Sequence, residues 1–399
     1  NGVIFLYESS ILLGSLVDPI LAWIITPKLT FCFIQYTYLK LSYIYLKMIE
    51  LLKTLSSIAK KAKRENKLLC FFLGNTKKLE NKKYYFTPVR ENEKIIFFGA
   101  VVYNDSIAEK IAKIVDGKVD YIFVDIEKKV KSKNNKYSLV NIERTIKERI
   151  KKSKIRVYKA NDLAITSTET LVNNFFLNDK RGLGGKKIII FGAGNIGFKL
   201  ALKFVESGAK TFLHRRSKAL AAKFAETLNL VKPEGTLSKV FAIDEEPKDL
   251  KNFDIIIAAT DKSNVINQKQ IKNIKKKTLL IDVGKGNFSR QAIMFLNKKK
   301  IDIYRLDITP SYFSYIENTI YTDQRYDKKN FSKIVNTLKL VTQGIVGQKN
   351  DIIVDDVQTP KKIFGVCSGL GSLIPFTQKQ KMSLVKKIKK NIKIDLTYD

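Results

Sequence analysis

The stretch KKIIIFGAGNIGFKLALKFVESGAKTFLHRRSKAL, residues 186–220, decides the fold of the central part of this chain. It sets the pattern G-x-G-x-x-G between an apolar IIIF run and an apolar segment with helical periodicity. In such a strand–turn–helix, the first glycine permits a tight turn, the second lets the backbone approach a pyrophosphate, and the third lets the helix pack on the strand. We therefore predict that this loop binds a dinucleotide at the start of the helix. Its residues are Gly192, Ala193, Gly194, Asn195, Ile196 and Gly197.

The second strand of this unit ends without a carboxylate. An acidic residue about 20 positions after the glycines would accept hydrogen bonds from an adenosine ribose. The chain instead has His214, Arg215, Arg216 and Ser217 at this place. Because arginine pairs with phosphate through two parallel N–H groups, these residues favour NADP as the cofactor, with NAD as the alternative.

Strands and helices keep alternating along this part of the chain. The predicted strands are 187–191, 210–214, 239–242, 254–259, 278–283 and 301–305, and the predicted helices are 195–207, 217–229, 267–274 and 289–298. This alternation predicts a doubly wound parallel sheet, the Rossmann fold. The loops after two of its strands, in AATDKSN and DVGKGN, share the edge where a nicotinamide ring would sit. Thr260, Gly284 and Lys285 are therefore predicted to contact that ring.

The chain before the glycine loop alternates in the same way. The predicted strands are 94–102, 119–127 and 154–162, and the predicted helices are 105–115, 138–153 and 166–177. Asp105 is the candidate N-cap of the first of these helices. Thr166 followed by Glu169 predicts a capping box at the start of the last one. Near the end of the chain we expect a helix at 330–342 and a basic helix at 377–391.

The pattern as a whole predicts an α/β protein of two domains, a C-terminal Rossmann doubly wound parallel sheet and a smaller N-terminal α/β domain. We place an N-terminal α/β substrate domain at 48–165 and a Rossmann NADP-binding domain at 166–310. Residues 311–399 are expected to form a C-terminal extension that packs back on the cleft between the domains.

The first 47 residues are apolar and aromatic. Asp18 and Pro19 interrupt one apolar run, and Gln35 and Lys40 interrupt the other, so neither is a clean membrane span. Two interpretations stay open. Translation begins near Met48 and this segment is upstream sequence read in frame, or the segment is a membrane-associated hairpin.

Composition narrows the classes of function. The chain carries 73 Lys and Arg against 38 Asp and Glu, a net charge of +35, which makes nucleic acid a partner to consider. The basic residues are spread through every segment and form no RNA-binding or zinc-finger signature, which argues against that partner.

Cys32, Cys70 and Cys367 have no metal spacing and fit a reduced, cytoplasmic compartment. Because His214 is the only histidine, we expect no metal and no Ser-His-Asp triad elsewhere.

Three stretches resemble a known cofactor domain. LGGKKIIIFGAGNIGFKLALKFVESGAKTFLHRRSKA, FDIIIAATDKSNVI and TLLIDVGKGN are similar to the NAD(P)-binding domain shared by shikimate dehydrogenase, methylene-tetrahydrofolate dehydrogenase and glutamyl-tRNA reductase. The resemblance runs from about Leu183 to Asp307 and implies an N-terminal α/β domain that faces the cofactor across a cleft. The chain lacks the threonine-proline-x-lysine stretch of the shikimate enzymes. Glutamyl-tRNA reductase needs a nucleophilic cysteine in its N-terminal domain, and Cys70 of this chain has no histidine partner. The resemblance therefore identifies no specific member.

The resemblance also implies where a substrate would be handled. YKANDLAITSTETLVNNFF is similar in position to the element that precedes the cofactor domain in shikimate dehydrogenase, where a lysine and an aspartate work on the substrate. It places Asn161 and Asp162 there, and more loosely Lys159. In such a pair the carboxylate orients the ammonium group that moves a proton. Further candidates are Asp125, Glu127 and Lys128 at the preceding strand end, and Asp282 with Lys285 on the cofactor side.

These observations predict an NADP-dependent oxidoreductase that transfers hydride to or from a small polar or anionic substrate in a cleft between the domains. The alternative is a regulatory protein that binds the dinucleotide without turnover, since the chain has no recognised catalytic lysine motif. We expect a small-molecule partner and a homodimer, and a membrane partner only if residues 1–47 belong to the protein.

Overall fold

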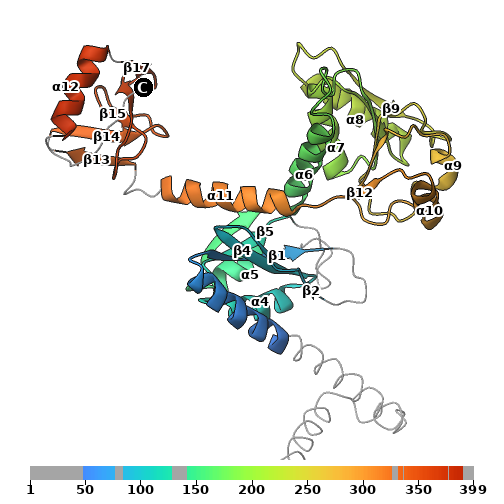
Figure 1. The fold of residues 1–399 in the computed structure, drawn as a ribbon, viewed down its shortest axis with the longest axis horizontal. Helices are drawn as coiled ribbons and strands as arrows, with labels where there is room; N and C mark the ends of the chain where they lie inside the picture. The colour runs from blue at the N-terminus through green and yellow to red at the C-terminus, as the bar shows by residue number, and fades with distance from the viewer. Residues whose placement is uncertain are drawn as a thin grey trace, which may run out of the picture. The chain divides into compact units, whose positions relative to one another are not determined.

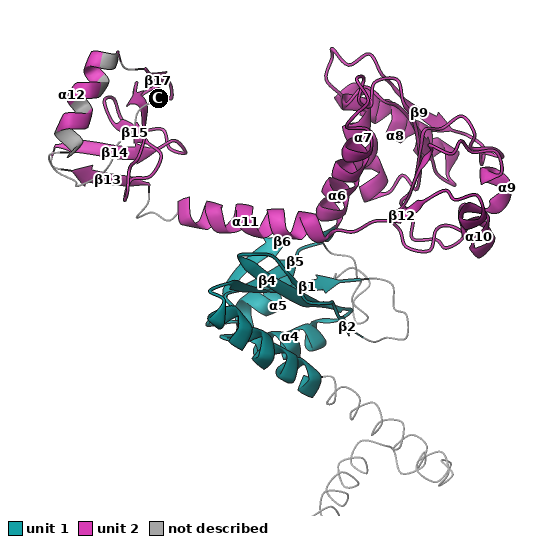
Figure 2. Ribbon diagram, in the orientation of Figure 1, with its two compact units in different colours: residues 1–160 teal, residues 161–399 magenta. Residues whose placement is uncertain are grey.

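The structure, a computed structural model, describes residues 48–76, 84–127, 142–325, 331–335, 337–375 and 377–389. The chain divides into two compact units, Asn1–Ala160 and Asn161–Asp399 (Figure 2). The apolar segment 1–47, Cys32 within it and the candidate Lys128 lie outside the described residues. Within the described ranges, no helix is long and apolar enough to cross a bilayer.

Unit 1 is built on a mostly parallel sheet with the strand order β2-β4-β1-β5-β6. Its strands are β1 (Leu68–Asn75), β2 (Tyr85–Phe86), β3 (Arg90–Glu91), β4 (Ile95–Val102), β5 (Tyr121–Asp125) and β6 (Lys154–Tyr158). β4, β1, β5 and β6 run parallel, and the short strands β2 and β3 pair antiparallel with β4. The smaller N-terminal α/β domain predicted from the alternation is thus present.

Period-two alternation gives the unit 1 sheet two different faces. Leu69, Phe71 and Leu73 of β1 belong to a core with the helix at 48–64, α4 (Asp105–Val115) and α5 (Ile142–Arg149). Phe72 belongs to the other face, where its ring stacks on that of Phe123 with 4.6 Å between centroids.

The start of α4 differs from the sequence prediction. Asn104, one residue before the predicted cap Asp105, is the N-cap, and its side chain accepts a hydrogen bond from the backbone N–H of Ile107 at 2.9 Å. Asparagine caps helices as well as aspartate does, so the residue type alone did not separate the two positions. Asp105 is therefore the first helical residue.

Unit 2 contains a six-stranded, all-parallel sheet with the order β12-β11-β10-β7-β8-β9. Its two edge strands, β12 and β9, are labelled in Figure 1. The strands are β7 (Lys187–Phe191), β8 (Lys210–His214), β9 (Val240–Ile243), β10 (Ile255–Ala258), β11 (Leu279–Asp282) and β12 (Ile303–Arg305). Numbered along the chain, this is the order 3-2-1-4-5-6 read from the other edge, which is the order of a dinucleotide-binding Rossmann sheet. The predicted doubly wound sheet is confirmed.

Helices cover both faces of this sheet. The helices after its strands are α7 (Asn195–Glu206), α8 (Lys218–Val231), α9 (Gln268–Ile271) and α10 (Arg290–Lys298). α7 and α8 share one apolar core with residues such as Ile188 and Ile190 of β7. α9 and α10 share the other core, to which β7 contributes Ile189 and Phe191. The continuous IIIF run is buried because both faces are covered.

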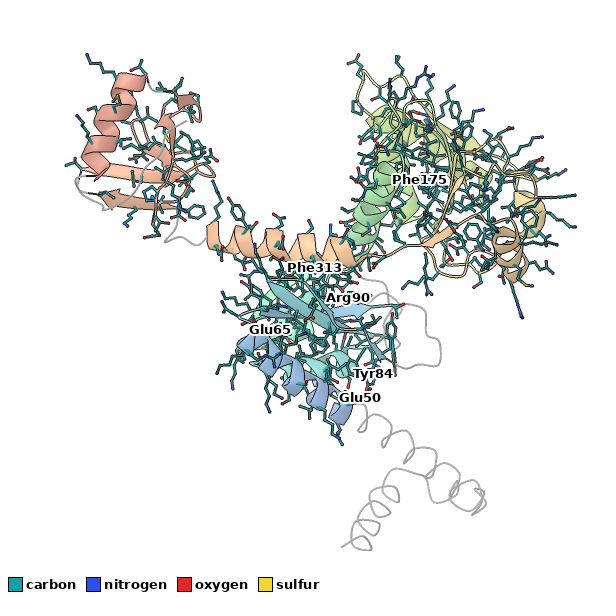
Figure 3. All side chains as sticks on the ribbon, in the orientation of Figure 1. Glu50, Glu65, Tyr84, Arg90, Phe175 and Phe313 are labelled. Carbon is teal, nitrogen blue, oxygen red and sulfur yellow. The ribbon has the colours of Figure 1, made fainter. Side chains whose placement is uncertain are left out.

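Two long helices flank the sheet in sequence, α6 (Ala160–Phe175) and α11 (Thr309–Arg325). α6 begins at Ala160 and not at Thr166, so the predicted capping box is wrong: Thr166 lies inside the helix, and the Glu169 carboxylate pairs with Lys203 of α7 at 2.6 Å. Strand β6 ends at Tyr158, which leaves room for an earlier helix start. At the end of α6, Phe175, labelled in Figure 3, packs edge-on to Tyr304 of β12 with 6.3 Å between ring centroids.

The end of the chain forms a small five-stranded sheet and one helix. Its elements are β13 (Ser332–Val335), β14 (Leu338–Thr342), β15 (Ile352–Val354), β16 (Ile363–Cys367), β17 (Leu373–Ile374) and α12 (Gln378–Lys389). The helix predicted at 330–342 is wrong, because these residues form the antiparallel pair β13–β14. The apolar spacing at 334, 335, 338 and 341 fits a helical face, but burial of Leu340 and Val341 in the sheet decided the outcome.

Candidate functional site

Strand β7 leads directly into the predicted glycine loop. Gly192 has a φ of +101°, and a Cβ on it would lie 2.6 Å from the carbonyl oxygen of Ala259. A Cβ on Gly197 would lie 1.9 Å from the carbonyl oxygen of Gly192, so only glycine lets α7 approach the strand this closely. A Cβ on Gly194 would meet nothing within 4 Å. Gly194 therefore faces open space, where its lack of a side chain leaves room for a ligand.

The N-terminus of α7 is open to an anion. Its N-cap, Gly194, supplies no side-chain hydrogen bond, and the first turn contains no acidic residue. Asn195, the first residue of the helix, is exposed. Backbone N–H groups at such a helix start attract negative charge through their aligned dipoles. The loop thus has the backbone arrangement that holds a diphosphate.

The loop also lies at the point where the strand order reverses. β7 has β8 on one side and β10 on the other, although β8 and β9 both lie between β7 and β10 in the chain. Doubly wound sheets bind ligands at this place, outside the carboxyl ends of the strands. The backbone of Ala259, which follows β10, touches Gly192, and so the glycine loop and the β10 loop meet there.

The four residues at the end of β8 divide into two pairs. The Arg215 guanidinium donates a hydrogen bond to the carbonyl oxygen of Ala193 at 2.9 Å and lies over the Phe224 ring, 5.3 Å from its centroid. His214 is half-buried beside Phe191, and burial lowers its pKa, with Glu246 opposing the shift. Arg216 and Ser217 are exposed, and the Ser217 hydroxyl makes no capping bond to α8. Arg216 and Ser217 are therefore free to face a ligand, whereas Arg215 is already bonded to the loop.

The loops after β10 and β11 are joined by a buried asparagine that sequence reasoning missed. Asn287 is fully buried, and its amide nitrogen donates to the carbonyl oxygens of Thr260 at 3.0 Å and Lys262 at 2.5 Å. A Cβ on Gly284 would lie 2.1 Å from the Thr260 carbonyl oxygen and 2.3 Å from Asn287 Oδ1. Asp282 accepts hydrogen bonds from the backbone N–H groups of Gly286 and Asn287. The only sequence signal for Asn287 was its place directly after GKG in DVGKGN.

This geometry gives each predicted loop residue a local role. Gly284 has to be glycine because of the close carbonyl, and Lys285 has a φ of +63°. The Thr260 hydroxyl accepts a hydrogen bond from the backbone N–H of Lys262 at 3.2 Å. The loops that would border a nicotinamide are thus held together by their own polar groups.

Comparisons with known proteins agree with this geometry. Residues 177–302 match the family model of shikimate / quinate 5-dehydrogenase. Together with β12, this part of the chain forms an NAD(P)-binding Rossmann domain. The match groups the chain with NAD(P)-dependent dehydrogenases and reductases. A comparison with curated protein sequences found no match.

The solved structures that match cover about half to two thirds of this chain and are distant in sequence. A dipicolinate synthase subunit from Bacillus halodurans is 15% identical with a TM-score of 0.32, over 65% of this chain and 98% of that chain. Its counterpart from Bacillus subtilis is 16% identical with a TM-score of 0.32, over the same shares of 65% and 98%. L-tryptophan dehydrogenase from Nostoc punctiforme is 16% identical with a TM-score of 0.33, over 52% of this chain and 57% of that chain.

Asp162, which the sequence led us to pair with Lys159, forms an ion pair with Lys199 in the unit that contains the Rossmann domain. It lies in the first turn of α6, and its carboxylate accepts a hydrogen bond from Lys199 of α7 at 2.5 Å. The two side chains are 43% and 40% exposed. The phenol of Tyr315 on α11 is near enough that burial first, and the Asp162 charge second, raise its pKa. Lys159 is exposed just before α6, and Asn161 stands beside Asp162 in its first turn.

Asp125 and Cys70, which were also considered from the sequence, are both buried. Asp125 ends β5 and is buried, and its Oδ1 accepts a hydrogen bond from the backbone N–H of Glu127 at 3.1 Å. Burial raises the pKa of the Cys70 thiol well above its usual range, so this residue stays protonated and is no nucleophile. Among the residues that the structure describes, no group of three His, Cys, Asp or Glu side chains could hold a metal ion.

Proposed function

We propose that the protein is an NADP-dependent oxidoreductase that transfers hydride to or from a small polar or anionic substrate. The match of residues 177–302 to a dehydrogenase family supports an NAD(P)-dependent oxidoreductase. One observation carries the finer proposal: the uncapped N-terminus of α7 opens beside Gly194, and Arg216 and Ser217 stand exposed at the end of the neighbouring strand.

The choice of NADP rests on the end of β8. NADP differs from NAD by a phosphate on the adenosine ribose, and the end of the second Rossmann strand is where that ribose lies. The exposed Arg216 guanidinium can form two parallel hydrogen bonds to a phosphate, and the Ser217 hydroxyl can donate a third. No carboxylate stands among residues 214–218 to bind the free hydroxyls of NAD.

The nicotinamide end of the cofactor would lie at the loops after β10 and β11. Thr260, Gly284 and Lys285 are the proposed contacts, and Asn287 is added because its buried amide joins the two loops. The bound cofactor supplies the hydride chemistry, and these residues orient its ring and exclude water.

For the proton we propose a lysine oriented by Asp162. Sequence reasoning named Lys159 with Asn161 nearby, and the hydrogen bond to Asp162 adds Lys199 as a candidate. A carboxylate that orients an ammonium group is one way to deliver a proton to the reacting oxygen. We further propose that the chain's charge of +35 draws anionic substrates toward the cofactor site.

The test is turnover with a defined set of substrates. Full-length protein is incubated with NADPH and with keto acids, cyclic ketones and folates, and oxidation of the cofactor is followed by its absorbance. We expect NADPH consumption with one class and markedly less with NADH. Tight NADPH binding without any turnover would instead support the regulatory protein that binds the dinucleotide without chemistry.

A variant pair assigns the proton step. Asp162→Asn removes the carboxylate charge that pairs with Lys199. Glu169→Gln is the matched control, since it removes a carboxylate charge further along α6 that pairs with Lys203. We expect turnover to fall about tenfold or more in Asp162→Asn and to stay unchanged in Glu169→Gln. Equal effects of the two substitutions would contradict a role of Asp162 in the reaction.

A further inference from the structure

The carboxyl edge of the unit 1 sheet contains acceptor atoms that the fold does not use. β1 has β4 on one side and β5 on the other, so the order of the parallel strands reverses at β1, as it does in unit 2 (Figure 1). Such a reversal opens a crevice beyond the strand ends, where doubly wound sheets bind ligands. Asn75, the last residue of β1, lies at this reversal.

The orientation of the Asn75 amide is fixed by its donors. Its nitrogen donates to the carbonyl oxygen of Glu127 at 2.8 Å and, at the limit of the range, to that of Asp125 at 3.5 Å. A flipped amide would set its oxygen against these two carbonyl oxygens, so the assignment of the two amide atoms follows from the contacts. Asn75 is 9% exposed, and its Oδ1 has no hydrogen-bond partner.

A second unused acceptor lies at the end of the adjacent strand. Asn75 pairs in register with Val102, and the backbone N–H of Thr76 donates to the Val102 carbonyl oxygen at 3.2 Å. Asp105 follows three residues after Val102, as the first residue of α4. Its Oδ1 is buried without a partner, and burial raises the pKa of its carboxyl.

The fold does not require these two oxygens. Asn104 already caps α4, so Asp105 is not the cap. The Asn75 amide nitrogen alone joins β1 to the residues after β5. Buried polar atoms are almost always hydrogen-bonded, and two orphan acceptors at one sheet edge call for donors from outside the chain. Asp125, also buried at this edge, is a second acidic side chain there in addition to Asp105.

We propose that the carboxyl edge of β1 and β4 in unit 1 is a binding site for a protonated primary amine, with Asn75 and Asp105 as its acceptors. An ammonium group carries three donors and no acceptor, and its charge compensates the carboxylate of Asp105, whose Oδ1 is buried. A hydroxyl group offers only one donor and no charge, so it answers these two acceptors less well.

The inference uses residues of unit 1 alone and needs no dinucleotide. Only its extension to the enzyme, that the substrate carries an amino group, rests on the proposed function. A failure to bind NADPH would therefore leave the amine site standing, and a failure to bind an amine would leave the cofactor site standing.

The experiment compares two small cations on full-length protein. Ethylammonium carries N–H donors, whereas tetramethylammonium has the same charge without any donor. Each is titrated while saturation-transfer NMR records ligand binding and the side-chain amide resonance of Asn75 is followed in labelled protein. We expect saturable binding of ethylammonium, with a shift of the Asn75 resonance, and much weaker binding of tetramethylammonium.

Variants locate the site. Asp105→Asn keeps the shape of the side chain and should weaken ethylammonium binding about tenfold or more, the usual cost of a lost charge-assisted hydrogen bond. Glu93→Gln makes the same change of charge at an exposed position in unit 1 and should bind as the wild type does. No ethylammonium binding by the wild type, equal binding of both cations, or an unchanged affinity in folded Asp105→Asn would each overturn the proposal. The wild-type comparison decides alone if Asp105→Asn does not fold.

Discussion

The Arg215 guanidinium donates a hydrogen bond to the carbonyl oxygen of Ala193, 2.9 Å away, and so ties the end of β8 to the glycine loop. Its position over the Phe224 ring leaves it little freedom to turn toward a ligand. Arg215 and Arg216 are adjacent in sequence, yet only Arg216 is exposed. We propose that the two arginines have different tasks: Arg215 holds the glycine loop in place, and Arg216 binds the additional phosphate of NADP.

Arginine substitutions separate these tasks. Arg216→Ala should weaken NADPH binding about tenfold to a hundredfold and leave NADH binding nearly unchanged, because only NADPH carries the additional phosphate. Arg215→Ala should weaken both coenzymes by similar factors, since it releases the loop. Affinities come from calorimetric titration, and Arg181→Ala, an exposed arginine before β7, is the control. Equal losses for both coenzymes in Arg216→Ala would contradict the division of tasks.

The glycines of the loop should respond differently to a methyl group. Gly194 has a φ of −89° and open space around its Cβ direction, so Gly194→Ala should melt within a few degrees of the wild type but lose most of its dinucleotide affinity. Gly197→Ala should lower the melting temperature markedly, because the new Cβ would lie 1.9 Å from the Gly192 carbonyl oxygen. Thermal melts and coenzyme titrations of both variants check this. Full coenzyme affinity in Gly194→Ala would refute the placement of the diphosphate.

Asn287 should contribute to the stability of the fold because it joins the two loops after β10 and β11. Asn287→Ala leaves the carbonyl oxygens of Thr260 and Lys262 without their donor, which should cost about 1–3 kcal/mol of unfolding free energy. Asn273→Ala, which removes an exposed amide that donates to Asp249, should cost less than about 1 kcal/mol. Chemical denaturation measures both values. Equal costs for the two substitutions would show that Asn287 does not hold the loops.

The single histidine gives a pH signature. Burial lowers the pKa of His214, so the unfolded chain binds its proton at a higher pH than the folded protein does. Stability from this residue is therefore complete above the unfolded value of about 6.5 and is lost as pH falls from there toward the lowered folded pKa. The melting temperature of the wild type minus that of His214→Gln should decrease as pH is lowered through this window. A difference that is flat with pH would show that the His214 pKa is not lowered.

The elements that were predicted correctly are those whose structure depends on residues close together in the sequence. The glycine loop, the strand IIIF and the alternation along 187–305 are local patterns, and each led to the right element. Period and burial decide such patterns within one strand or helix. Two predictions were wrong, a helix start at Thr166 and a helix at 330–342. In the second case the apolar spacing fits a helical face and a hairpin equally well, and burial of Leu340 and Val341 in the sheet decided for the hairpin β13–β14.

The site was less predictable where its contacts join distant positions. The partner of Asp162 is Lys199, 37 residues away, and Asn287 reaches Thr260 across 27 residues. No spacing rule connects such pairs, since they depend on how helices and loops come together in space. The orphan oxygens of Asn75 and Asp105 belong to the same class, because only a structure shows that a buried acceptor has no donor.

The most direct measurement is calorimetric titration of the folded full-length protein with NADPH and with NADH. The account predicts saturable heat with both coenzymes and a tighter complex with NADPH. It also predicts that Arg216→Ala removes this preference for NADPH. No heat with either coenzyme, on protein that melts cooperatively, would contradict the central claim that the turn at Gly194 binds a dinucleotide.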